Sequence, residues 1–122
     1  MELEVGMYVR TEDGYIDKLL KIDSCLGILQ SWHLEKMNTC YSNDDFTKAS
    51  YNLIDLVKVG DFVNNHEVLR IDETYSDATY KNKYKYLWIN FGKDVIKNED
   101  IKSIVTREQI ESTSYKVGGK YD

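Results

Sequence analysis

The sequence predicts a mainly β protein, a small antiparallel barrel that ends in a short helix. Three observations support this fold class. Apolar and polar residues alternate along several short stretches, which is typical of strands with one buried face. A glycine-containing hairpin motif occurs twice, at residues 5–9 and 59–63, and a helix-start signal occurs near residue 106. At 122 residues, the chain has the length of a single domain, 1–122.

The doubled motif is Val-Gly-x-Tyr/Phe-Val, followed by a turn and by a segment that ends in Ile-Asp. In the second copy, Val59–Val63 precedes a turn at residues 64–66, and in the weaker first copy residues 5–9 precede a turn at residues 11–14. Glycine and asparagine tolerate positive φ, so both suit tight turns. The motif resembles the opening of many SH3-like barrels, in which a glycine bends the first strand. An SH3-like or related barrel is therefore expected, and nothing beyond this motif is expected to repeat.

The other elements follow from periodicity and from turn residues. Strands are expected at residues 2–10, 15–24, 26–34, 59–63, 68–71, 83–91, 95–97, 101–106 and 115–117. Residues 35–50 carry turn chemistry without a clear period, so a loop is expected there, and Asn52 is expected to cap one helical turn at residues 52–56. Thr106 and Gln109 have the spacing of a capping box, which predicts a helix at residues 107–112.

Six or seven of these strands are expected to pack around one core. The core is expected to contain Val5, Val9, Ile22, Phe62, Val68, Ile71, Ile89, Phe91, Ile104 and Val105. The stretch 83–91 is apolar on both faces, which is typical of a central strand or of a strand that meets a partner. An exposed apolar face on this strand would favour a homodimer, because two-fold pairing is the commonest way to cover such a face.

Composition narrows the range of functions. The net charge is −5 and the pI about 5.0, so indiscriminate phosphate binding is disfavoured, whereas an acidic surface suits a basic partner. The start of the chain does not resemble a signal peptide, and no apolar run is long enough to span a membrane. Cys25 and Cys40 are too few for a disulfide scaffold. We therefore expect a cytoplasmic protein with both thiols reduced.

Motifs for catalysis, metal binding and cofactor binding are weak or missing. Cys25, His33, Cys40 and His66 do not have the close pairing of zinc ligands. A cysteine nucleophile paired with a histidine has no local motif in its support, and neither a phosphate-binding loop nor a dinucleotide fingerprint occurs. We expect a protein that is not an enzyme, with no cofactor; a hydrolase remains the weakest alternative.

The stretch Tyr80–Trp88 is the clearest candidate for binding. Tyr84, Tyr86 and Trp88 would lie on one side of a strand, and Lys81, Lys83 and Lys85 on the other. Aromatic faces stack on bases while lysines neutralise phosphate. The other interpretation, which the sequence favours, is that the aromatic residues are core and that the lysines protect a strand edge from pairing. Arg107 is a further candidate, since a helix N-terminus favours anions.

Three phrases of the sequence carry a family resemblance. They are the early Val-Gly-x-Tyr/Phe-Val motif, the phrase from Asn52 to Asn64 and the phrase from Glu99 to Val117. The chain resembles a group of small phage and prophage proteins of low-GC Gram-positive bacteria, over residues 3–23, 51–72 and 98–117. Residues 24–50 and 80–97 lie outside this resemblance, and it implies no catalytic residues.

The resemblance implies an antagonist of bacterial host defence. Such proteins often bind a defence effector stoichiometrically, as anti-CRISPR proteins do, or sequester a cyclic or ADP-ribose-type nucleotide signal. Direct sequence-specific binding of nucleic acid is not expected. A flat or convex acidic face would indicate a protein partner, and a deep pocket with aromatic walls and a Lys or Arg would indicate a small anionic ligand.

Overall fold

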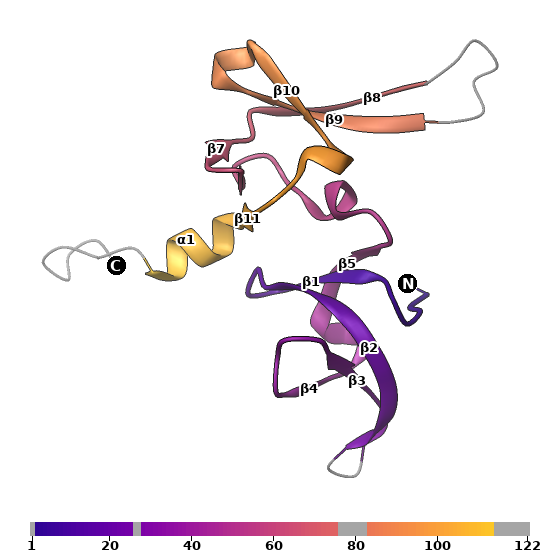
Figure 1. Cartoon of the computed structure of the whole chain (residues 1–122). Coiled ribbons are helices and arrows are strands. Elements are labelled where there is room, and N and C mark those ends of the chain that lie inside the picture. The colour runs from indigo at the N-terminus through magenta and orange to yellow at the C-terminus, as the bar shows by residue number, and fades with distance from the viewer. Residues whose placement is uncertain (1, 26–27, 76–82, 114–122) are drawn as a thin grey trace, which may run out of the picture.

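The computed structural model describes residues 2–25, 28–75 and 83–113 and is mainly antiparallel β with one short α-helix at the end (Figure 1). The strands of the first half are β1 (Tyr8–Thr11), β2 (Ile16–Cys25), β3 (Ile28–Leu34), β4 (Cys40–Tyr41) and β5 (Phe46–Ser50). Those of the second half are β6 (Phe62–Val63), β7 (His66–Glu67), β8 (Arg70–Tyr75), β9 (Lys83–Ile89), β10 (Asp94–Lys97) and β11 (Ile104–Val105). The helix α1 spans Arg107–Thr113, and the 3₁₀ turns of the described residues are η1 (Asn43–Asp45), η2 (Leu53–Leu56), η3 (Asn90–Gly92) and η4 (Asn98–Asp100).

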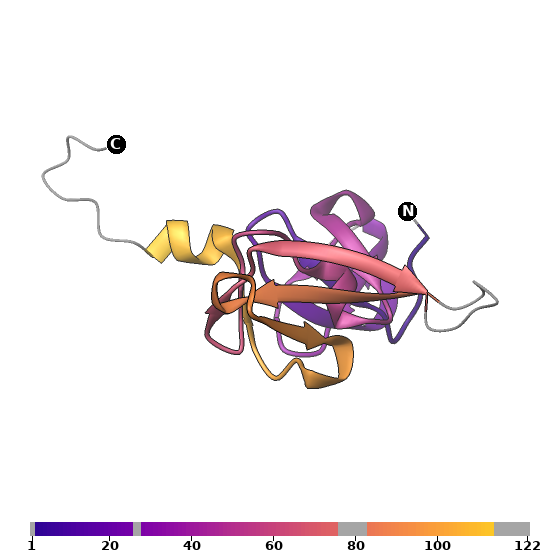
Figure 2. The same ribbon diagram turned by 90° about the horizontal axis from the view of Figure 1, so that it is seen from above.

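Within the part of the chain that the structure describes, the strands form three sheets. One has five strands in the order β4-β3-β2-β1-β5, and two have three strands each, in the orders β10-β9-β8 and β11-β6-β7. Seen from above, the β8–β10 sheet lies over the first half of the chain and α1 extends to one side (Figure 2). The predicted antiparallel β class and the short C-terminal helix are confirmed, whereas in the described part of the chain the sheets are not closed barrels.

The two halves of the chain repeat one pattern of strand pairing. In the first half β1 pairs with β2 and β5, and β3 pairs with β2 and β4. In the second half β6 pairs with β7 and β11, and β9 pairs with β8 and β10. Because β7 and β8 follow each other along the chain and together take the place of β2, the second half repeats the strand order of the first.

The correspondence between the halves continues residue by residue. His33 corresponds to Trp88, and their cross-strand partners are Cys40 and Val95. The separation in the sequence from His33 to Trp88 equals the separation from Cys40 to Val95. That interval also separates β3 from β9 and η1 from η4. The repeat therefore extends well beyond the doubled motif, and the prediction that nothing else repeats is wrong.

The glycine-bent hairpins are confirmed in both halves. Gly6 and Gly60 have φ of 96° and 97°, a backbone region that only glycine enters without strain. The Gly6 N–H donates to the Leu19 carbonyl at 2.9 Å, and the Gly60 N–H donates to the Val68 carbonyl at 3.0 Å. In each hairpin the return residue, Leu19 or Val68, donates back at 2.8 Å to the residue that follows the glycine. The shared motif thus builds the same bend twice.

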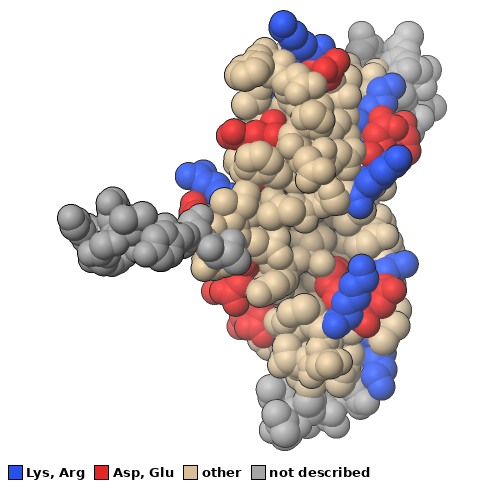
Figure 3. Space-filling view, turned by 60° about the vertical axis from the view of Figure 1, so that its left-hand side comes forward, with Lys and Arg blue, Asp and Glu red and all other residues tan. Residues whose placement is uncertain are grey.

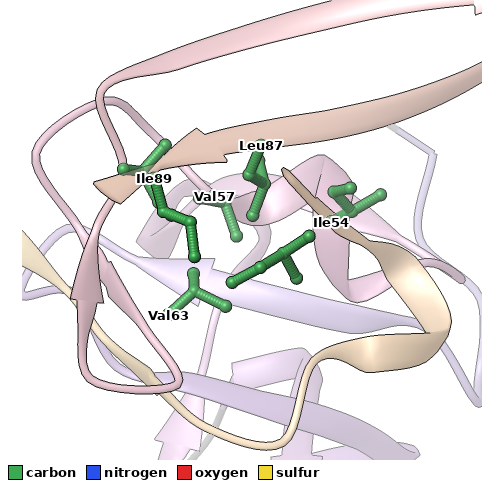
Figure 4. Packing of buried hydrophobic residues seen from close by; sticks show 7 residues of the cluster. Ile54, Val57, Val63, Leu87 and Ile89 are labelled. Atoms are coloured by element: carbon green, nitrogen blue, oxygen red, sulfur yellow. The ribbon is translucent and has the colours of Figure 1, made fainter. Parts of the chain in front are cut away.

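Each half has its own hydrophobic cluster, so the expected single core is divided. The first cluster contains Val9, Leu19, Trp32, Leu34 and Phe46. The second contains Ile54, Val57, Val63, Val68, Leu87, Ile89 and Ile96, and Figure 4 shows several of these side chains converging beneath β9. Of the predicted core residues, Val9, Val68 and Ile89 are buried in one cluster or the other. Ile71 and Ile104 pack against the second cluster, and Phe62 is half-buried.

Four predicted core residues are exposed instead. Val5 precedes the Gly6 bend at the surface, and Ile22 lies toward the tip of the β2–β3 hairpin. Val105 alternates with Ile104 and so faces away from the second cluster. Phe91 lies in the turn η3 rather than in the strand, and its side chain is 94% exposed. The prediction is wrong at these positions because register and strand ends, rather than hydrophobicity, decide which face is covered.

A buried ionic network joins the two halves and the helix. The guanidinium of Arg10 on β1 donates to both carboxylate oxygens of Asp61, and both side chains are fully buried. Arg10 also donates to the Glu108 carboxylate on α1, at 2.6 and 3.0 Å, and to the Leu56 carbonyl at 2.9 Å. Since a buried charge is tolerated only when it is paired and hydrogen-bonded, this network makes the mutual position of the three segments specific.

The helix signals are largely confirmed. The Thr106 N–H donates to Gln109 Oε1 at 2.9 Å and the Gln109 N–H donates to Thr106 Oγ1 at 3.3 Å, which is the predicted capping box. The helical turn η2 forms at the expected place, but in the described part of the chain no hydrogen bond from the Asn52 side chain caps it. The predicted loop 35–50 instead contains β4, η1 and β5. The expected strand 115–117 lies outside the described residues.

Candidate functional site

An aromatic surface covers the outer side of the β8–β9–β10 sheet, and we call it the aromatic face. Leu87 and Ile89 point from β9 into the second cluster, so the alternate residues of the strand point outward (Figure 4). Cross-strand pairing adds side chains of β8 and β10 to the same side. The members of the aromatic face are Arg70, Asp72, Thr74, Tyr84, Tyr86, Trp88, Val95 and Lys97.

The aromatic residues of β9 are therefore not core, contrary to the interpretation that the sequence favours. Tyr84 is 40% exposed, and Tyr86 and Trp88 are half-buried. Their rings pack on one another along the strand: the ring centroids of Tyr84 and Tyr86 lie 6.1 Å apart, and those of Tyr86 and Trp88 lie 5.8 Å apart in an edge-to-face arrangement. Such pairs stabilise the row of rings beyond simple burial and hold it in place.

Two cations lie on the rings at the two ends of this row. The Arg70 guanidinium lies 5.0 Å from the centre of the Trp88 ring, and the Lys97 ammonium lies 5.9 Å from the centre of the Tyr84 ring. Asp72 Oδ2 accepts hydrogen bonds from the Trp88 indole N–H at 2.7 Å and from Arg70 Nε at 2.8 Å. The arrangement is thus a preformed row of aromatic rings with a cation at each end.

The candidate lysines lie elsewhere. Lys83 and Lys85 point to the same side of β9 as Leu87, away from the aromatic face. The Lys85 ammonium is 3.0 Å from Asp55 and 3.8 Å from Glu73. The Lys83 ammonium lies 5.5 Å from the centre of the Tyr75 ring. Lys81 lies outside the described residues.

A pocket of about 500 Å³ opens beside these lysines, at the end of the β8–β9 hairpin. It is lined by Asn52, Ile54, Asp55, Glu73, Lys83, Tyr84, Lys85, Lys97, Asn98 and Glu99. Three lysines therefore meet three carboxylates. Burial raises the pKa of Asp55, but hydrogen bonds from Ser50 and Lys85 outweigh it, so the pKa is lowered and Asp55 stays charged. The pocket is balanced in charge, and of the predicted aromatic residues only Tyr84 lines it.

Arg107 is separate from the aromatic face. It begins α1, and its side chain lies 3.2 Å from Glu111 in an ion pair. Its backbone N–H donates to Asp61 Oδ1 at 2.9 Å. The start of the helix is therefore already occupied by a carboxylate of the chain, and the candidate role of Arg107 in binding a ligand phosphate stays a prediction.

The histidines and cysteines do not form a recognisable centre. Within residues 2–25, 28–75 and 83–113, no group of three or more His, Cys, Asp or Glu is placed to hold a metal ion. His33 and Cys40 face each other across β3 and β4, but Cys40 is disulfide-bonded and so has no thiol to act as nucleophile. The expectation of a reduced thiol is wrong for Cys40, and the side chain of Cys25 lies outside the described part. His66 lies exposed on β7, apart from this pair.

The expected strand 83–91 ends at Ile89, so the turn to β10 begins at Asn90 and includes Phe91. Asn90, Phe91 and Gly92 all have positive φ, at 51°, 58° and 81°. A bulky residue in this region is strained, and Phe91 makes no compensating contact because it is almost fully exposed. The Asn90 and Gly92 turn signals mark the turn, but no sequence signal distinguishes a protruding phenylalanine from a core one.

The first half of the chain provides an internal reference for the aromatic face. The positions that correspond to Arg70, Trp88 and Val95 hold Lys21, His33 and Cys40. Ser31 stands where the second half has Tyr86, and Lys36 stands where it has Phe91. Since the same strand order forms without these aromatic residues, the fold does not require them.

Charge on the side of the molecule in Figure 3 is mixed. Lys and Arg alternate with Asp and Glu there, without the continuous basic stripe that tracks a nucleic-acid backbone. Among the described residues, no helix is long and apolar enough to cross a membrane. Comparison of the chain with family models, with curated proteins and with solved structures finds no match.

Proposed function

We propose that this chain is a non-enzymatic binding protein that inhibits a bacterial host-defence effector by stoichiometric association through its aromatic face. The observation that carries the proposal is the composition of that face. Trp, Tyr and Arg are the residue types that dominate binding energy at protein interfaces, and here they share one preformed surface. The fold itself does not need them, as the first half demonstrates.

The geometry favours a protein partner over a nucleic acid. Bases stack on open ring faces, but here Arg70 and Lys97 lie on the rings at both ends of the row, and Tyr86 packs edge-to-face against Trp88. Phe91, nearly fully exposed at the adjacent turn, suits insertion into an apolar pocket of a protein. The net charge of −5 also disfavours a polyanion.

The biological setting of the proposal comes from the resemblance to small phage proteins. It implies an anti-CRISPR-like inhibitor that acts in the cytoplasm of the infected host. Since that compartment keeps thiols reduced, the proposal requires that the fold persist when the Cys40 disulfide is reduced. The proposal includes a cellular protein as partner and no cofactor.

The proposal is tested by mixing the protein with purified defence effectors, beginning with CRISPR nucleases, and measuring association. Wild type is expected to co-elute at equal stoichiometry and to abolish effector cleavage. The Tyr86→Ala/Trp88→Ala double variant is expected to lose at least a hundredfold in affinity, since each is the type of residue whose truncation costs about 2 kcal/mol or more. Tyr51→Ala, an exposed tyrosine of the first half, is the matched control and is expected to bind as wild type. Failure to bind any effector, or equal loss in both variants, would contradict the proposal.

The pocket at the end of the β8–β9 hairpin supports a second candidate function, sequestration of a cyclic or ADP-ribose-type nucleotide. Its volume suits such a ligand, and Lys83, Lys97 and Tyr84 provide cations and a ring. Thermal shift with cyclic nucleotides tests this candidate. A shift that Lys97→Gln removes would support it, and the absence of any shift at millimolar ligand would reject it.

We further infer that each half corresponds to an SH3-like barrel. A shared strand order, in which β7 and β8 together take the place of β2, a glycine-bent first hairpin and a 3₁₀ turn before the last strand support this inference in each half. A homodimer through the aromatic face is also proposed for the free protein, because two-fold pairing would cover Phe91 and the rings. Light scattering of wild type and of Trp88→Ala tests the dimer: a mass of one chain for wild type would exclude it.

A further inference from the structure

We propose that Arg70 is a preformed receptor for a carboxylate, and that the segment bound at the aromatic face is an acidic segment of a protein, with an Asp or Glu next to an apolar side chain. This inference rests on the proposed function, since it specifies the chemistry of the partner that the aromatic face binds. It is carried by the geometry of Arg70, Asp72 and Trp88, three residues that sequence reasoning does not bring together.

Arg70 is held on two sides. Its Nε donates to Asp72 Oδ2 at 2.8 Å, and its guanidinium carbon Cζ lies 5.0 Å from the centre of the Trp88 ring. Asp72 is itself fixed by the Trp88 indole N–H at 2.7 Å. The side chain is nevertheless 65% exposed, so it is ordered by contacts and not by burial.

The two terminal nitrogens of Arg70 are left for a ligand. Among the residues that the structure describes, the Arg70 side chain donates a hydrogen bond only to Asp72, and it does so from Nε. A guanidinium offers two parallel N–H groups that match the two oxygens of a carboxylate or phosphate. Since Nε and the ring face are already engaged, little rotational freedom remains to be lost on binding, and this preorganisation favours affinity.

The corresponding position in the first half supports a specific role. Lys21 faces His33 there, as Arg70 faces Trp88. A lysine has a single rotatable ammonium and cannot offer the planar pair of donors. At this position the second half therefore has Arg70, which can bind a carboxylate in a fixed orientation, and the first half has Lys21, which cannot.

A protein carboxylate fits this site better than a nucleic-acid phosphate. Asp72 stands at the base of the site and cancels the charge of Arg70, so that with Lys97 the aromatic face carries one net positive charge, which suits a single carboxylate rather than a chain of phosphates. The rings beside it offer apolar area to a neighbouring side chain of the partner. Lys97 over the Tyr84 ring adds a second cation at the other end of the row for a further acidic residue.

The test is selection from a displayed random peptide library on immobilised wild-type protein, followed by affinity measurement of synthetic peptides. Enriched peptides are expected to contain Asp or Glu next to an apolar residue. Arg70→Gln and Arg70→Lys are each expected to weaken their binding at least tenfold, the latter because a lysine keeps the charge but loses the paired donors. Lys21→Gln removes the same charge at the corresponding position of the first half and is expected to bind as wild type.

Several outcomes would overturn the inference. They are enrichment of peptides without acidic residues, no enrichment at all, unchanged affinity in both Arg70 variants, or tighter binding of a single-stranded oligonucleotide than of any acidic peptide at the same site. Because Arg70 is largely exposed, both variants are expected to keep the wild-type melting temperature, so that lost binding is not lost folding. Acidic peptides that depend on Arg70, with no effector inhibited, would reject the proposed function alone. An effector that binds both Arg70 variants as well as wild type would reject this inference alone.

Discussion

Asp61 is the residue on which the junction between the two halves depends. It accepts from Arg10 and from the backbone N–H groups of Lys58 and Arg107 at 2.7 and 2.9 Å. The Asp61 carboxylate thus accepts hydrogen bonds from the first strand, from the bend before Gly60 and from the start of the helix. The doubled motif has Met7 at the corresponding position, so hydrophobic patterning gives no indication of this role.

Replacing Asp61 by asparagine is expected to destabilise the protein strongly. Among the described residues, the change leaves the buried Arg10 charge with Glu108 as its one carboxylate partner, and breaking a buried pair by removing one member costs about 3–5 kcal/mol. Urea unfolding of Asp61→Asn measures this loss. Glu108→Gln, at the partly exposed side of the network, is expected to cost less, and an equal or smaller loss in Asp61→Asn would contradict the assignment.

The same carboxylate predicts a pH dependence. Burial raises the pKa of Asp61, but hydrogen bonds from Arg10 and from the two backbone N–H groups outweigh it, so the pKa lies below its ordinary value. A lowered carboxyl pKa stabilises the fold above the unfolded value of about 3.9, and this contribution is lost as the pH falls below it. The stability difference between wild type and Asp61→Asn is therefore expected to be constant near neutral pH and to shrink on acidification below about pH 4. A difference that grows toward low pH would reverse the sign and contradict the account.

At the scale of single elements, the capping and glycine signals in the local sequence predicted the helix start and the bends well. The register between paired strands was not predictable from the sequence. The capping box at Thr106 and the bends at Gly6 and Gly60 depend on neighbours in the sequence, and all three are confirmed. Strands as short as β4 and β11 carry too few residues for a period to emerge. The aromatic stretch of β9 was identified as a candidate, but Arg70 and Asp72 reach it only through cross-strand pairing, which sequence periodicity does not define.

The cap of α1 gives a prediction at this scale. Thr106 Oγ1 accepts from the Gln109 N–H and donates to the Gly14 carbonyl at 2.7 Å. Thr106→Ala is expected to cost about 1–2 kcal/mol, the usual value for a lost N-cap. Thr106→Ser keeps the hydroxyl and is expected to retain most of the stability in the same urea titration. A serine variant as unstable as the alanine variant would show that the methyl group, and not the cap, matters.

In the turn η3, in contrast to the helix cap, a substitution is expected to leave the stability of the fold unchanged or to raise it. Phe91 has φ 58° and makes no buried contact, so its replacement by glycine removes strain without removing packing. Phe91→Gly is expected to leave the melting temperature unchanged or to raise it slightly, while weakening association with the bound effector at least tenfold. Leu87→Gly, on the buried side of the same hairpin, is expected to unfold the second half. A large loss of stability in Phe91→Gly would show that the residue is structural.

At the scale of the whole molecule, one strand order is used twice with different surfaces. The first half buries Trp32 and Phe46 in its cluster, and the second half puts its tryptophan outside, on the aromatic face. The amino-acid sequences of the two halves have little similarity outside the glycine motif, so the repeat is not evident from the sequence. It becomes evident when the cross-strand partners of the two halves are compared. The second half carries the aromatic face and the corresponding surface of the first half does not. This difference favours binding as the function of the chain.

Hydrogen–deuterium exchange of the free protein and of its complex with an effector tests this claim most directly. Added protection is expected in residues 70–75 and 83–97, which contain β8, β9, the protruding turn and β10, with the first half unchanged. Protection confined to residues 8–50, or an effector inhibited without any change in the β8–β10 sheet, would contradict the claim that the aromatic face is the binding surface.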